Sequence, residues 1–148
     1  MQDAKKYEEA IPYFSKASEL GDANAMGMLC LAYQVGSGVE ENLFTAINWC
    51  EDSFNTSNDK VVKNIISSVL GDIYFEQNNF KSAKKWYLES LDNLEKQSEK
   101  SDEANKIANK YFDAKHYTTS SYWYKVAVDN GNKDAMFRLA YSYNARKI

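Results

Sequence analysis

The stretch SAKKWYLES, residues 82–90, decides the fold because two other parts of the chain repeat its pattern. Trp86 stands three residues after Ala83, and Trp49 and Trp123 also stand three residues after a small residue. The three tryptophans are separated by two equal intervals of 37 residues. A fixed period of this size indicates a protein built from repeated supersecondary units.

A second series of residues recurs along the chain and describes the other half of the unit. It consists of tyrosines that follow a leucine or isoleucine by four residues and a small residue by three: Tyr33, Tyr74, Tyr111 and Tyr143. Residues at i, i+3, i+4 and i+7 share one face of a helix. Leu70, Gly71 and Tyr74 are therefore expected on one face of a first helix. Ala83 and Tyr87 are expected on one face of a second helix.

Gly71 lies in the middle of an expected helix, where glycine costs about 1 kcal/mol relative to alanine. We expect that its missing side chain lets the next helix approach closely at Ala83. The unit is then a pair of antiparallel helices, with large residues filling the gaps between pairs. The pattern predicts an all-α chain of about eight helices, at residues 5–20, 22–35, 42–55, 59–77, 80–97, 101–114, 117–130 and 132–146.

The composition agrees with one folded helical domain. The 148 residues are 44% hydrophobic and 26% charged, with one proline and six glycines, fewer turn residues than sheet-rich folds need. The net charge of −3, without a run of more than two basic residues, argues against nucleic acid as a partner. No apolar stretch approaches the roughly 20 residues of a membrane span, so membrane insertion is not expected. The first ten residues lack the apolar core of a secretory signal, which favours a cytoplasmic location.

Local signals mark the expected helix ends. A short side-chain acceptor at an N-cap satisfies the open N–H groups of the first turn, and the expected N-caps are Asp22, Asn42, Asn79 and Ser101. Gly21 and Gly131 suit helix ends, where the backbone becomes left-handed. The polar stretch EKQSEKSDE, residues 95–103, is expected to be a flexible connection.

These residues together resemble the tetratricopeptide superfamily over nearly the whole chain. Residues 21–50, GDANAMGMLCLAYQVGSGVEENLFTAINWC, are similar to the Sel-one-like variant: an Ala-x-x-x-Leu-x-x-x-Tyr helix, a Gly-Ser-Gly-Val loop, then Ala-x-x-Trp. The units around Tyr74 and Tyr111 have a shorter loop and resemble plain tetratricopeptide repeats. The resemblance implies a right-handed α-α superhelix, or solenoid, that binds other proteins or peptides.

Alignment to the repeat divides the chain into a half-repeat, three repeats and a second half-repeat, at residues 1–21, 22–58, 59–98, 99–131 and 132–148. The first half-repeat is the second helix of a pair, and the last is the first helix of a pair. Solenoids normally cap their ends with polar faces. We therefore expect a segment of a longer array, or ends that meet another surface. One hypothesis is end-to-end self-association between the last helix of one molecule and the first helix of another.

In this family the other face of the first helices lines a concave groove, and projection of the repeat places the expected binding residues there. They are Gln34, Asp72, Phe75, Asn105, Asn109, Phe112, Arg138 and Tyr141. Phe75, Phe112 and Tyr141 are the expected anchors, with the asparagines and Arg138 setting orientation. The alternative is that the two phenylalanines only pack between helix pairs. Relatives that clamp a C-terminal carboxylate use several basic residues, whereas only Arg138 and Lys106 are available here.

The sequence offers little for catalysis or metal binding. His116 is the only histidine, and a nucleophilic site needs a base oriented by a carboxylate. Residues 36–41, GSGVEE, follow a helix and lack the third glycine of a phosphate loop, so we expect a simple connection. Cys30 and Cys50 lie on the two helices of one pair and can approach each other. We expect two reduced, buried thiols.

The sequence therefore predicts a non-enzymatic interaction module that needs no cofactor and binds a partner protein or peptide in a concave groove. The alternative is a structural or self-associating spacer within a larger solenoid. RNA binding has the repeat period in its favour, but the acidic balance and the scarcity of arginines argue against it.

Overall fold

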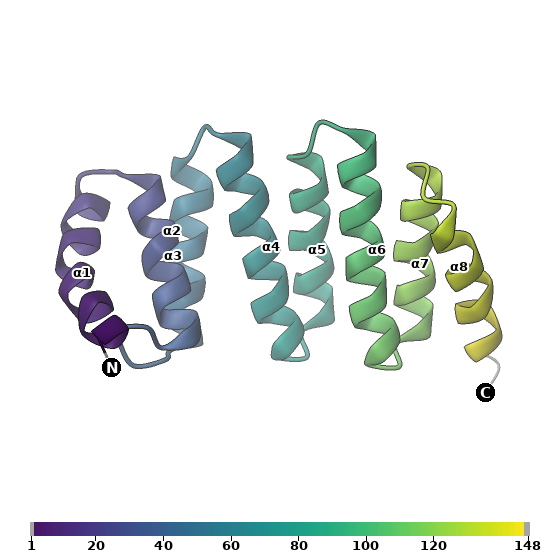
Figure 1. Cartoon of the computed structure of the whole chain (residues 1–148), viewed down its shortest axis with the longest axis horizontal. Coiled ribbons are helices and arrows are strands. Elements are labelled where there is room, and N and C mark those ends of the chain that lie inside the picture. Colours follow the sequence, from purple (N-terminus) through teal and green to yellow (C-terminus); the bar gives the residue numbers. More distant parts are fainter. Residues whose placement is uncertain (1, 147–148) are drawn as a thin grey trace. The chain divides into compact units, whose positions relative to one another are not determined.

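The computed structural model describes residues 2–146 as eight helices and their connections (Figure 1). The helices are α1 (Gln2–Glu19), α2 (Ala23–Val35), α3 (Leu43–Thr56), α4 (Lys60–Glu76), α5 (Phe80–Asp92), α6 (Gln97–Asp113), α7 (Tyr117–Asp129) and α8 (Asp134–Ala145). Each predicted helix is present, and the described residues contain no strand. The prediction of an all-α fold is confirmed.

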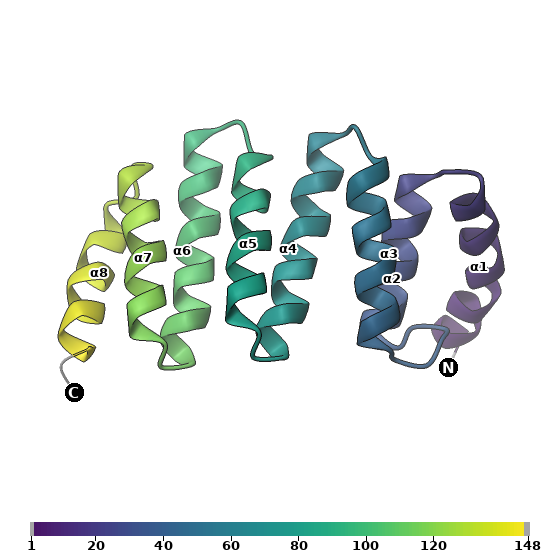
Figure 2. The same cartoon turned by 180° about the vertical axis from the view of Figure 1, so that it is seen from behind.

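The helices group into two compact units, Met1–Asn93 and Leu94–Ile148. In the first unit α2 pairs with α3 and α4 pairs with α5, while α1 packs on α2 and α3 packs on α4. In the second unit α6 pairs with α7, and α8 packs on α7. Figures 1 and 2 show successive helices of each unit running in opposite directions, side by side. Each unit is thus a stack of antiparallel helices, as the repeat predicts.

The tryptophan repeat marks packing between successive helices. In the first unit Trp49 and Trp86 pack against a buried core of α2, α3 and α4 residues that includes Leu70. The Trp86 ring of α5 meets Phe54 of α3 edge to face, with ring centroids 5.2 Å apart. In the second unit Trp123 is fully buried. The tryptophans recur because each second helix repeats the same packing task.

Gly71 makes a close approach between α4 and α5 possible. A Cβ atom built on Gly71 would lie 2.5 Å from Cδ1 and Cε1 of Tyr87, closer than real Cβ contacts allow. The space is therefore filled by the ring of Tyr87, which lies one helical turn after Ala83 on α5. Both Ala83 and Tyr87 are buried, so the predicted inward face of α5 is correct.

Cys30 and Cys50 form a disulfide between α2 and α3. The expectation of two reduced thiols is therefore wrong, although both sulfurs are as buried as expected. In the repeat, Cys30 corresponds to Gly71 and Cys50 to Tyr87. Helices of a pair come closest at this position, and here the two Cα atoms are 5.1 Å apart, within the usual range for a disulfide. A covalent bond thus replaces the glycine–tyrosine contact of the next pair.

Most predicted helix ends are correct. The side chains of Asp22, Asn42 and Asn79 accept hydrogen bonds from backbone N–H groups in the first turns of α2, α3 and α5. Gly21 and Gly131 have the left-handed φ values expected after a helix, +88° and +98°.

Ser101 is not an N-cap, because α6 already begins at Gln97. Ser101 lies inside this helix and is buried. Most of the polar stretch at residues 95–103 is therefore the beginning of α6 and not a flexible connection. The sequence reading failed here because the residues before Ser101 are polar and carry no apolar period.

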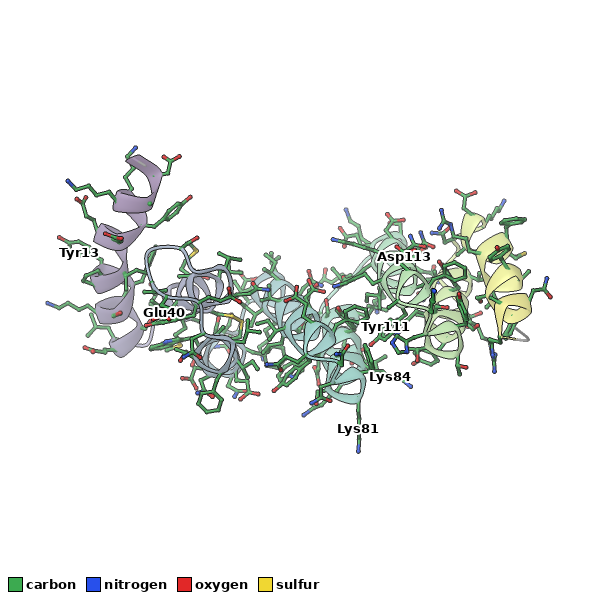
Figure 3. The ribbon with its side chains drawn as sticks, turned by 90° about the horizontal axis from the view of Figure 1, so that it is seen from below. Tyr13, Glu40, Lys81, Lys84, Tyr111 and Asp113 are labelled. Carbon is green, nitrogen blue, oxygen red and sulfur yellow. A yellow bond between two sulfur atoms is a disulfide. The ribbon has the colours of Figure 1, made fainter. Side chains whose placement is uncertain are left out.

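The connection between α2 and α3 is longer than the connections inside the later pairs, and it lies against α1. Gly38 in this connection has a φ of +75°. A Cβ atom on Gly38 would lie 2.5 Å from the carbonyl carbon of Tyr7 and 2.7 Å from the backbone nitrogen of Glu8. Figure 3 shows Glu40 of this connection and Tyr13 on opposite sides of α1. The connection therefore contacts α1 through its backbone.

Candidate partner-binding surface

A pocket of about 250 Å³ in the second unit collects residues from its three helices. Phe112 comes from the last turn of α6 and Tyr124 from the middle of α7, while Phe137, Arg138 and Tyr141 come from α8. α6 and α8 are the first helices of successive repeats, so the pocket lies between two equivalent helices with α7 contributing to its lining. The described part of the chain therefore holds a largely aromatic pocket with one cationic side chain.

Phe112 is the central ring of this pocket. Its centroid lies 5.1 Å from that of Tyr117 and 6.4 Å from that of Tyr124, both with steeply inclined planes. The ring of Tyr141 lies 5.6 Å away, tilted by 51°. Aromatic rings prefer such inclined arrangements over face-to-face stacking. Phe112 is half-buried, so it packs between the helices and still lines the pocket.

Asn109 fixes the polar edge of the pocket. Its Oδ1 accepts a hydrogen bond from the Tyr124 hydroxyl at 2.6 Å and another from Nη1 of Arg138 at 2.9 Å. Burial raises the pKa of Tyr124, and the hydrogen bond and charge of Arg138 offset part of that rise. The tyrosine therefore stays a neutral donor at physiological pH. One amide oxygen thus orients both a pocket ring and the exposed guanidinium.

The outer rim of the pocket is apolar and accessible. Phe137 is 77% exposed and Tyr141 57% exposed. Large apolar side chains in this state, beside polar groups, mark surfaces that other molecules contact. Asn105 lies one helical turn before Asn109 on α6. Its Oδ1 is buried and makes no hydrogen bond within residues 2–146.

Three of the predicted site residues belong to the first unit, and two of them have contacts inside it. Asp72 accepts a hydrogen bond from the Tyr87 hydroxyl at 2.6 Å. Phe75 meets Phe80 edge to face, with centroids 5.4 Å apart. Gln34 is half-buried on α2. These three residues are not part of the pocket in the second unit.

The structure thus brings four of the predicted site residues together: Asn109, Phe112, Arg138 and Tyr141. It adds Tyr124, which the sequence reading did not place in the site because it belongs to a second helix. The signal was present, since Tyr124 stands 37 residues after Tyr87.

Nothing in the described residues forms a metal centre or a membrane span. Across residues 2–146, no three side chains of His, Cys, Asp or Glu gather closely enough to hold a metal ion. Over the same range, every helix is too short or too polar to cross a lipid bilayer.

Comparisons with known proteins agree with this architecture. A tetratricopeptide repeat family model matches residues 68–93, which cover the end of α4 and all of α5. A Sel1 repeat protein from Oxalobacter formigenes has a similar structure, with a TM-score of 0.57 and 22% identity over 87% of this chain. A protective antigen of uropathogenic Escherichia coli strains, which displays an SLR fold, has a TM-score of 0.63 and 20% identity over 93% of this chain. The chain spans 52% and 29% of the lengths of these two proteins. No curated protein sequence matches the chain.

Proposed function

We propose that this chain, a tetratricopeptide-like helical repeat protein with the fold of the Sel1-type solenoids, is a non-enzymatic module that binds a partner protein. Repeats of this type generally mediate protein–protein interaction. The finer proposal is that the partner inserts an apolar side chain of a peptide segment into the pocket between α6 and α8.

The observation that carries this proposal is the preordered aromatic pocket with an exposed rim. Phe112 and Tyr124 are held by ring packing and by Asn109, so their rotamer entropy is already lost before binding. Phe137 and Tyr141 remain exposed and lose water-accessible apolar area when a partner covers them. Interface energy usually concentrates in a few aromatic and arginine residues of this kind.

Arg138 gives the proposed site its polarity. Its guanidinium is held at one edge by Asn109 and remains exposed, so it can still donate hydrogen bonds to a partner. We assign it the role of orienting the peptide, together with Asn105 and Asn109. Gln34, Asp72 and Phe75 are proposed as further partner contacts on the first unit.

The test starts with cross-linking capture of the partner by the intact chain, followed by calorimetry with the purified partner. We expect Phe137→Ala and Tyr141→Ala each to weaken binding by about 2 kcal/mol, or roughly 30-fold. Phe44→Ala is the matched control, because Phe44 on α3 is 75% exposed and lies outside the pocket. Equal affinities for all three variants and the parent chain would place binding elsewhere.

A further inference from the structure

The three helix pairs of the chain bury the same positions on their second helices. These positions are at most 1% exposed in each pair, and they are Ala46, Cys50 and Ser53 in α3, Ala83, Tyr87 and Ser90 in α5, and Ser120, Tyr124 and Ala127 in α7. In α1 the same positions hold Ala10, Phe14 and Ala17. All three are only partly buried. α1 is therefore a second helix, and its matching first helix is not among residues 2–146.

α8, in contrast, lacks the second helix of its pair within residues 2–146. In the complete pairs, two positions of the first helix are buried: Met26 and Cys30 in α2, Ser67 and Gly71 in α4, and Ala104 and Ala108 in α6. The same positions of α8 hold Met136, which is 57% exposed, and Ala140, which is also exposed. Tyr143 is 45% exposed, whereas its counterpart Tyr111 is fully buried. α8 is a first helix without its second helix in the described chain.

The two open faces also match in their hydrogen-bonding groups. In the pair α4–α5, Tyr87 donates to Asp72, the residue after Gly71. In the pair α6–α7, Tyr124 donates to Asn109, the residue after Ala108.

At the open faces both members of this bond are absent. The donor position of α1 holds Phe14, which has no hydroxyl group, and the acceptor position of α8 holds Tyr141 in place of an acidic or amide residue. An α1–α8 pair therefore leaves no carboxylate or side-chain amide without its tyrosine donor at this position, whereas a helix without that tyrosine would do so beside Asp72 or Asn109, at a cost.

We propose that the open face of α8 binds α1 of a second copy of this chain, with Phe14 of one copy packed against Ala140 of the other. This contact repeats the packing of the Tyr87 ring against Gly71, without the hydroxyl group. It joins two different surfaces, so each copy keeps one open face and can add a further copy. The contact uses Met136, Ala140 and Tyr143 and has Tyr141 at its acceptor position, whereas the partner pocket uses Phe137, Arg138 and Tyr141. Tyr141 is shared, but the proposal does not rest on the proposed function, because Phe137→Ala alters the pocket alone.

A concentration series of the intact chain gives the first test. We expect the weight-average mass from light scattering or sedimentation to rise with concentration to at least twice that of one chain. A mass that stays at one chain up to the highest soluble concentration overturns the proposal.

Two blocked variants give a sharper test. Ala140→Lys places a charge on the open face of α8, and Ala10→Lys places one on the open face of α1. Each variant alone is expected to remain a single chain, because every contact needs both faces. An equimolar mixture is expected to form a complex of two copies and nothing larger. The unchanged α1 face of the Ala140→Lys chain binds the unchanged α8 face of the Ala10→Lys chain, and the two remaining faces are blocked. Association of either variant alone, or a mixture that stays at one chain, overturns the proposal.

Controls separate this contact from general effects. Phe44→Lys adds the same charge at an exposed position of α3, and Phe137→Ala alters the pocket, so both are expected to associate like the parent chain. Circular dichroism checks that each variant is folded. Because Ala140 is exposed, the Ala140→Lys variant tests the proposal even when Ala10→Lys is unstable. A folded Ala140→Lys chain that associates like the parent is contrary to it.

Discussion

The ring of Tyr87 occupies the space that a side chain at Gly71 would need, with two ring carbons 2.5 Å from the position of the absent Cβ. The same tyrosine donates its hydroxyl group to Asp72, the residue after the glycine. One side chain of α5 therefore fills a notch in α4 and is held there by the neighbouring carboxylate. This arrangement determines how closely the two helices approach.

Gly71→Ala is expected to destabilise the chain, even though alanine is the better helix former by about 1 kcal/mol. The added methyl group meets a buried ring that the Asp72 hydrogen bond holds in place, and overpacking of this kind costs about 1–3 kcal/mol. Urea unfolding followed by tryptophan fluorescence measures the change.

Gly27→Ala is the matched control for this substitution, because Gly27 is also a buried glycine inside a helix. Its added Cβ would meet the terminal methyl group of Ile66 at 3.0 Å, and that flexible end can move aside. We expect Gly27→Ala to cost less than Gly71→Ala. The reverse order would contradict the role assigned to Tyr87.

Removal of the tyrosine hydroxyl groups tests the two equivalent hydrogen bonds. Tyr87→Phe is expected to lower the free energy of unfolding by about 1.5 kcal/mol, because its acceptor is the side chain of Asp72. Tyr124→Phe is expected to cost about 1 kcal/mol, because the amide of Asn109 is a neutral acceptor. Chemical unfolding of the two variants under the same conditions shows which substitution lowers the free energy of unfolding more. A larger loss for Tyr124→Phe would argue against this ranking.

Loss of the Cys30–Cys50 disulfide is expected to destabilise the first unit. A cross-link that closes a loop of this size contributes about 3 kcal/mol, so the Cys30→Ala/Cys50→Ala variant should unfold at a lower urea concentration than the oxidised parent. Cys30→Gly/Cys50→Tyr is the comparison variant, because it copies the Gly71–Tyr87 contact and should recover part of the loss. Thiol titration of the denatured, unreduced parent should find no free thiol. Two free thiols per chain would refute the cross-link.

Stability is expected to fall at high pH because of Tyr111. Burial raises the pKa of Tyr111 from 10.0 to about 12, since the charged phenolate is poorly solvated inside the unit. Below pH 10 the folded and unfolded chains both carry the neutral phenol. Between pH 10 and 12 the unfolded chain loses this proton first, so the free energy of unfolding declines by up to about 3 kcal/mol.

Urea midpoints measured across this pH range should show a weaker decline for Tyr111→Phe than for the parent chain. Tyr13→Phe is the control, because Tyr13 is 77% exposed and its removal should leave the decline in place. Identical pH profiles for the parent and Tyr111→Phe would show that another group causes the loss.

Much of the fold was predictable because each repeat solves the same packing problem with the same residue types. Small residues such as Ala83 and Ala108 mark helix crossings, and small residues recur at the equivalent positions of other repeats, which composition alone does not explain. Caps such as Asp22 and Asn79 act through local hydrogen bonds, so they are visible without tertiary context.

The disulfide was harder to predict, because two buried cysteines give the same sequence pattern whether they are reduced thiols or bonded to each other. The deciding fact is that Cys30 and Cys50 sit at the repeat positions of Gly71 and Tyr87, where the helices of a pair touch. For the candidate site, the repeat placed Phe112, Arg138 and Tyr141 on one face. The orientation of Arg138 depends on Asn109, and that contact spans 29 residues, which no local pattern specifies.

The close backbone contact of Gly38 with Tyr7 and Glu8 limits which helical hairpins of this chain can be rearranged. The short connections of α4–α5 and α6–α7 make their backbone hydrogen bonds to the helix that precedes them in the same pair, so those hairpins are better suited to insertion or duplication. The connection of the hairpin α2–α3, in contrast, packs against α1, the helix that precedes the hairpin in the chain. If this hairpin were moved elsewhere in a chain, it would need a neighbouring helix whose backbone is equally accessible to Gly38. Without such a helix, Gly38 would face solvent in a left-handed conformation that no contact stabilises.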